Sequence, residues 1–160
     1  MLNGFSKYYA MTGWRLGYII APRDFVRPIQ KLQQNLFICA SSISQWAGVA
    51  ALTEHHSELD DMVAIYDKRR KFLMKSLPEL GFKVKVEPQG AFYILADAQR
   101  FTSNSFQFSL DILEKAHVAT TAGVDFGKNA EGFLRFSYAN NLQNIKEAMQ
   151  RLEKYLQKNE

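Results

Sequence analysis

The stretch from residue 3 to residue 22 reads NGFSKYYAMTGWRLGYIIAP, and it decides how the rest of the chain is interpreted. Lys7 and Arg15 are its only charged residues, and they stand among aromatic, small and apolar residues. A lysine among aromatic side chains is expected to be partly desolvated, and desolvation lowers the pKa of an amine. An amine that loses its proton near neutral pH can form a Schiff base with an aldehyde. A planar guanidinium is suited to bind phosphate.

A second interpretation of the same residues is a hairpin whose lysine and arginine are simply solvated, as most charged side chains are. Gly13 and Gly17 flank Arg15, and glycines allow the backbone to approach a ligand closely. The residues alone leave both interpretations open.

The string from Ser6 to Tyr18 resembles the cofactor-lysine segment of fold type I pyridoxal-phosphate-dependent aminotransferases, the class I/II, aspartate-aminotransferase-like group. The resemblance implies that Lys7 is the catalytic lysine that bonds to pyridoxal 5'-phosphate and that Arg15 binds the cofactor phosphate. Gly4 stands where some members carry a phosphate-binding hydroxyl. Ser6 is expected to supply a hydroxyl instead, and the alternative is that Ser6 only shapes the turn.

A second charged site is predicted in residues 132–139, GFLRFSYA. Alternation in a strand places Arg135 on one face, and both faces are apolar enough to be expected buried. An unpaired buried charge is very costly, so Arg135 needs either a carboxylate of the protein or an anionic ligand. The string resembles the aminotransferase strand whose arginine binds the substrate α-carboxylate, which implies that role for Arg135.

Two further segments resemble the same family. Residues 88–93, PQGAFY, resemble its turn and strand near the substrate. Residues 118–127, VATTAGVDFG, resemble a family segment that usually has a proline directly before the glycine matched by Gly123. Ala122 replaces that proline. His117 stands where a helix-ending glycine is common, and histidine takes the left-handed conformation at some cost.

The composition is that of a globular protein, with 160 residues, 47% hydrophobic and 22% charged. The net charge of +4 suits anionic partners such as phosphate cofactors, carboxylate substrates or nucleic acid. Residues 68–71 are basic but are interpreted as a solvated helix face. Cys39 is the only cysteine, so no intrachain disulfide forms; it is expected to pack, and the chain suits the cytoplasm. His55 and His56 are expected at the surface, and no apolar run is long enough to span a membrane.

Hydrophobic periodicity predicts an α/β fold, with strands and helices in alternation. Helices are predicted at residues 25–36, 44–55, 58–78 and 106–116, with a last helix from Asn141, and Phe106, Leu110 and Leu113 are expected to face inward. Strands are predicted at residues 14–21, 82–87, 91–96, 118–121 and 133–138. The resemblance divides the chain into residues 1–50, a remnant of the large cofactor-binding domain, and residues 51–160, the small α+β C-terminal domain.

The resemblance covers the whole chain but only the C-terminal part of the family. Family members carry a long segment before the lysine, which supplies the partner of the cofactor ring nitrogen and a phosphate-binding loop. We therefore expect transamination between an amino acid and a 2-oxo acid at the family level, and a chain that is inactive alone and self-associates as a homodimer. The alternatives are a non-catalytic self-associating fragment, a pyridoxal-phosphate-dependent carbon–sulfur lyase, and a basic nucleic-acid binder.

Overall fold

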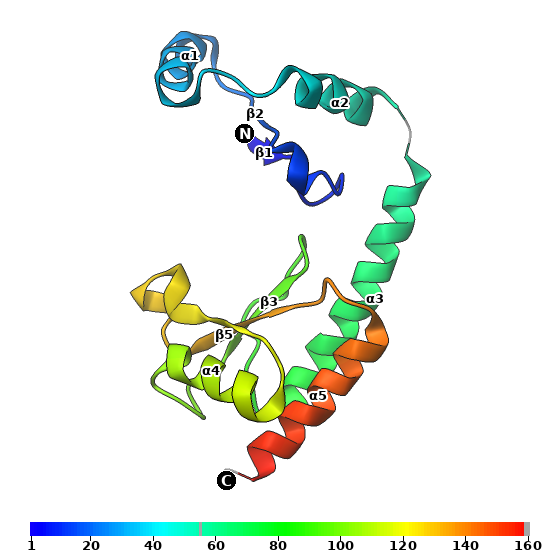
Figure 1. Ribbon diagram of the computed structural model, residues 1–160, viewed down its shortest axis with the longest axis vertical. Helices are drawn as coiled ribbons and strands as arrows, with labels where there is room; N and C mark the ends of the chain where they lie inside the picture. The colour runs from blue at the N-terminus through cyan, green and yellow to red at the C-terminus, as the bar shows by residue number, and fades with distance from the viewer. Residues whose placement is uncertain (55, 159–160) are drawn as a thin grey trace. The chain divides into compact units, whose positions relative to one another are not determined.

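The computed structural model describes residues 1–54 and 56–158, and the chain divides into two units, Met1–Val63 and Ala64–Glu160. The division falls within helix α3, Ser57–Glu79 (Figure 1). His55 lies outside the described residues, whereas His56 is partly buried. The mixture of helices and strands confirms the α/β expectation.

The first unit begins with a two-stranded antiparallel hairpin, β1 (Leu2–Gly4) and β2 (Gly17–Ile19), in which Asn3 pairs with Tyr18. A 3-10 turn, η1 (Thr12–Trp14), lies between the strands, and helices α1 (Arg23–Phe37) and α2 (Ser42–Thr53) follow. The unit has a small core in which Phe5, Met11 and Ala51 are buried. The predicted strand 14–21 is therefore shorter, because the turn at Thr12–Trp14 takes its first residues.

Helix α1 buries none of its residues within the chain. Its apolar side chains recur at the 4, 3, 4 spacing of one helical face, and the basic residues Arg23, Arg27 and Lys31 follow another line. Phe25, Leu32 and Leu36 are all exposed. The first unit thus carries an exposed apolar surface along α1.

The second unit contains an antiparallel sheet of order β3–β5–β4, in which β3 is Tyr93–Asp97, β5 is Phe133–Ser137 and β4 is Thr121–Ala122. Helices α4 (Ser105–Ala116) and α5 (Leu142–Gln157) belong to it, with two 3-10 turns, η2 (Gly123–Phe126) and η3 (Lys128–Ala130). Instead of the predicted strand 82–87, only an isolated bridge joins Lys83 to Asp97.

One face of this sheet is buried and the other is not. Ile94, Leu134 and Phe136 lie on the core face, together with buried side chains of α3, α4 and α5. Arg135 lies on the other face and is only partly buried. The expectation that both faces of this strand are buried is wrong, because the helices of the unit supply buried side chains to one face only.

Helix α4 turns a different face inward from the predicted one. Phe106, Leu110 and Leu113 are exposed, whereas Phe108 and Ile112 are buried. Apolar residues occur on both faces of this helix, so periodicity did not distinguish them. Helix α5 is present where the last helix was predicted, and its buried residues Ile145, Met149, Leu152 and Leu156 form one stripe at 4, 3, 4 spacing.

Three smaller findings complete the description. Cys39 is exposed, so the expectation that it packs in a core is wrong. Among the described residues, no helix is long and apolar enough to cross a membrane. No cluster of metal-ligating side chains occurs in residues 1–54 and 56–158.

Candidate active site

The loop that carries Lys7 is held at both ends by backbone hydrogen bonds. Phe5 N donates to Leu16 O at 3.2 Å, and Met11 N donates to Phe5 O at 3.3 Å. The Phe5 ring is buried, which fixes the start of the loop in the small core of the first unit. The local sequence therefore gives Lys7 a defined backbone position rather than a free hairpin tip.

Lys7 and Ser6 lie next to each other on this loop. Ala10 N donates to Lys7 O at 3.1 Å, and the Thr12 hydroxyl donates to Ser6 O at 2.8 Å. Lys7 is exposed, and Ser6 is partly buried. The expected desolvation of Lys7 is therefore not found within this unit. Aromatic residues of the loop pack on one another: the rings of Phe5 and Tyr9 lie 5.2 Å apart, and those of Tyr8 and Tyr9 lie 5.0 Å apart.

Arg15 ends the 3-10 turn in the left-handed conformation, with φ 51° and ψ 43°. Left-handed backbone is unusual for a residue with a side chain and is often found at functional sites. Its Nη1 donates to Thr12 O at 3.0 Å, which directs the guanidinium along the turn. Arg15 lines a cavity of about 960 Å³ in the first unit, together with Asn3, Tyr18 and Gln30.

Ser44 fixes the position of the residue before Arg15. Its hydroxyl donates to Trp14 O at 2.7 Å, and the side chain is buried. The predicted helix 44–55 begins two residues earlier, at Ser42, so Ser44 lies inside α2. The sequence did not identify this contact, because the two residues are far apart in the chain.

The two flanking glycines have different explanations. A Cβ on Gly17 would lie 3.0 Å from Asn3 O, so its absence serves the pairing of β1 with β2. A Cβ on Gly13 would meet nothing within 4 Å. The close pairing of β1 with β2 therefore favours glycine at position 17.

The residues present fit a phosphorylated aldehyde. An exposed primary amine and an exposed guanidinium belong to one pinned segment, and these are the groups that an aldehyde and a phosphate require. Lys7 does not line the cavity beside Arg15. We therefore assign neither the aldehyde nor the phosphate of such a ligand to this cavity.

Arg135 lies on the central strand of the second unit, between an aromatic side chain from β3 and one from the turn η2 that follows β4. Its Cζ lies 4.3 Å from the centre of the Tyr93 ring and 4.6 Å from that of the Phe126 ring. Its Nη2 donates to the Thr121 hydroxyl at 3.2 Å. Within the described part of the chain, no carboxylate forms an ion pair with Arg135. The alternative of a structural ion pair is thus not found. The partly buried guanidinium of Arg135 can therefore pair with the carboxylate of a ligand.

The loop that carries Phe126 is fastened by a carboxylate that the sequence did not reveal. Glu131 Oε1 accepts hydrogen bonds from Ser105 N at 2.6 Å and from Gly132 N at 2.8 Å. The backbone and hydroxyl groups of Ser105, followed by the Gly132 N–H, lower the pKa of the Glu131 carboxyl. The Ser105 hydroxyl also accepts from Val124 N at 3.2 Å. No sequence motif identifies Glu131, because its hydrogen-bond partners are backbone groups that the fold brings together.

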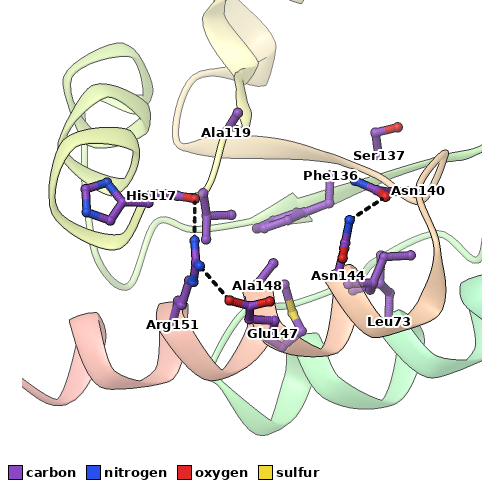
Figure 2. A pocket seen from close by; sticks show the side chains of 13 residues that line it. Leu73, His117, Ala119, Phe136, Ser137, Asn140, Asn144, Glu147, Ala148 and Arg151 are labelled. Carbon is purple, nitrogen blue, oxygen red and sulfur yellow. Dashed lines mark hydrogen bonds and ion pairs between the residues drawn. The ribbon is translucent and has the colours of Figure 1, made fainter.

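A separate pocket of about 430 Å³ lies beside α5 (Figure 2). Its polar groups bond to one another: Arg151 donates to Glu147 Oε1 at 2.5 Å and to His117 O at 3.5 Å, and Asn144 donates to Asn140 at 3.1 Å. His117 has the left-handed conformation expected at the end of α4, with φ 55°. Because these groups already have protein partners, we do not assign the pocket a ligand.

Lys7, Ser6 and Arg15 belong to the first unit, and Arg135 belongs to the second.

Residues 1–152 match the family model of aminotransferase class I and II. The chain belongs to this aminotransferase family. Fold type I, which the resemblance implied, is thereby supported over nearly the whole chain.

The chain is similar to aminotransferases of several kinds. It is 40% identical, over 99% of its length, to a (5-formylfuran-3-yl)methyl phosphate transaminase of Methanocaldococcus jannaschii. It is 40% identical, over 98% of its length, to an aspartate aminotransferase of Pyrococcus horikoshii. The crystal structure of an aromatic aminotransferase from Pyrococcus horikoshii matches 99% of this chain with a TM-score of 0.90 and 39% identity.

The chain covers 42%, 41% and 42% of these three proteins, respectively. It therefore spans about two fifths of the length of the aminotransferases that it matches.

Proposed function

We propose that this chain carries the cofactor lysine and the substrate-binding arginine of a pyridoxal-phosphate-dependent enzyme that transfers an amino group between an amino acid and a 2-oxo acid. The observation that carries the proposal is the pinned loop from Phe5 to Leu16, which presents Lys7 and Arg15 exposed on one segment. The relatives are transaminases of different printed substrates, so the amino acid is left as a class.

Each residue has a distinct task in this proposal. Pyridoxal phosphate, when bound, supplies an aldehyde and a ring that withdraws electrons from the substrate carbon. Lys7 would hold the cofactor through its amine, and the same amine, when free, would carry a proton to and from the substrate carbon. Arg15, with Ser6 beside Lys7, binds the phosphate. Arg135 orients the substrate through its carboxylate.

Cofactor labelling tests the first half of the proposal. The chain is mixed with pyridoxal phosphate and then with borohydride, which fixes an amine–aldehyde adduct as a secondary amine, and the labelled peptide is identified by mass spectrometry. We expect one predominant site, Lys7, because this exposed amine shares the pinned loop with Arg15, the arginine proposed to bind the phosphate. Lys7→Arg is expected to remove that label, and Arg15→Ala to reduce it strongly.

Two exposed residues of the first unit provide matched controls. Lys31→Arg and Arg23→Ala remove an exposed amine and an exposed guanidinium away from the loop, so both should leave the Lys7 label unchanged. Equal labelling of Lys7 and Lys31 would contradict the assignment. So would a Lys7 label that persists at full yield in Arg15→Ala, since Arg15 would then not bind the phosphate.

We also propose that the chain self-associates, as a homodimer. Phe25, Leu32 and Leu36 leave one apolar face of α1 exposed, and burial of such a face is worth about 25 cal/mol per Å². A soluble chain rarely leaves so much apolar surface uncovered.

Sedimentation equilibrium over a range of chain concentrations tests the association. The dimer is expected to predominate at micromolar concentrations, and the double substitution Leu32→Gln, Leu36→Gln is expected to shift the equilibrium toward monomer. Gln34→Ala, at an exposed polar position of the same helix, serves as the control. A chain that stays monomeric at millimolar concentration contradicts the proposal.

The assignment of residues 1–50 to a cofactor domain and of residues 51–160 to a small domain stays a prediction. The boundary between the two units of the structure lies further along the sequence, between Val63 and Ala64, within α3.

A further inference from the structure

The aromatic side chains around Arg135 come from opposite sides of its strand. Tyr93 belongs to β3, which pairs with β5 along one edge, and Phe126 ends the turn that follows β4, which pairs along the other edge. Thr121 stands directly across the β4–β5 ladder from Arg135 and accepts one of its hydrogen bonds. The guanidinium is thus contacted from both neighbouring strands.

Phe126 is unusual because its ring is 51% exposed although the loop that carries it is tightly fixed. A Cβ on Gly123, at the start of η2, would lie 2.0 Å from Ala130 O, so the loop closes on itself there. Ser105 and Glu131 fasten the same loop to the start of α4 and to the residue before β5. The structure therefore holds an exposed aromatic ring in one place, and that place is over Arg135.

We propose that Phe126 is a positioning residue for the carboxylate site: its ring holds the Arg135 guanidinium in one orientation, with the hydroxyl of Thr121 fixing one Nη. An aromatic ring attracts a guanidinium and limits its rotation without using its N–H donors. The donors that Thr121 does not engage then present a preorganised fork to a carboxylate. This inference rests on the proposed role of Arg135 as the carboxylate ligand.

Nuclear magnetic resonance on the 160-residue chain tests the inference with pyruvate as the probe. Pyruvate is titrated while the Nε–H resonance of Arg135 and the backbone amides of β4 and β5 are followed, and the neutral pyruvamide is the ligand control. Phe126→Leu is expected to weaken pyruvate binding about 2-fold to 5-fold. It is also expected to shift the Arg135 Nε–H resonance before any ligand is added, since the ring current is lost.

Three variants separate positioning from general damage. Phe126→Tyr keeps the ring and is expected to bind pyruvate as the unsubstituted chain does. Phe106→Leu removes a ring that is 54% exposed elsewhere in the same unit, and it should change neither reading. Phe126→Met is a second ring-free variant, for use if the leucine variant loses its dispersed amide spectrum.

The outcomes distinguish the two proposals. If Arg135→Gln abolishes pyruvate binding but the ring-free variants bind normally, the role of Phe126 is overturned and the carboxylate site stands. An unchanged Arg135 Nε–H resonance in the ring-free variants overturns the positioning role as well. If pyruvate causes no shift that depends on Arg135, the carboxylate site itself is overturned.

Discussion

Replacement of Arg135 by glutamine is expected to weaken pyruvate binding by roughly 10-fold to 150-fold, which corresponds to about 1.5–3 kcal/mol for hydrogen bonds to a charged group. The partly buried guanidinium has aromatic neighbours and a threonine hydroxyl, but no ion pair with a carboxylate in the described residues. Removal of its charge therefore leaves the ligand carboxylate without a cation. The pyruvate titration followed through the amides of β4 and β5 measures the change.

Arg135→Lys distinguishes charge from geometry at the same position. Lysine keeps the positive charge but lacks the planar fork that binds a carboxylate with two parallel hydrogen bonds. We expect the free energy of pyruvate binding to the lysine variant to lie about midway between that of the unsubstituted chain and that of the glutamine variant. Equal affinity of the lysine variant and the unsubstituted chain would show that a point charge suffices, and would contradict a bidentate contact.

The substitution Leu134→Ala is expected to destabilise the second unit by about 2–5 kcal/mol, because it leaves a cavity in a packed core. Leu134 is 0% exposed, on the core face of the central strand. Leu95→Ala is the matched control on the same sheet, where the side chain is 43% exposed and faces the Arg135 side. The control is expected to lose less than about 1 kcal/mol, in proportion to the smaller area that it buries.

Urea unfolding followed by far-ultraviolet circular dichroism measures this difference. Both tryptophans, Trp14 and Trp46, lie in the first unit, so their fluorescence reports on that unit separately. Leu134→Ala should lower the midpoint of the ellipticity change by about 1–2.5 M urea, for a slope of about 2 kcal/mol/M. Similar midpoints for the two alanine variants would show that the core face is assigned wrongly.

The candidate site was predictable from the sequence in part. The string around Lys7 and Arg15 and the strand around Arg135 pointed to the family, which the match over residues 1–152 supports. Glu131 and Ser44 could not be found in this way. Each acts through hydrogen bonds with backbone groups distant in the chain, and such partners depend on the fold rather than on residue type.

The sequence by itself determined the helices with one apolar stripe and the family of the chain. Helix α5 follows its 3.6-residue pattern because one of its faces is apolar and the other polar. Only the tertiary structure decided which face of α4 is buried and how Arg135 is surrounded. Helix α4 is apolar on both sides, and the choice of Phe108 and Ile112 over Phe106 and Leu110 depends on what packs against it. The neighbours of Arg135 come from other strands, and pairing between distant segments is not encoded in local periodicity.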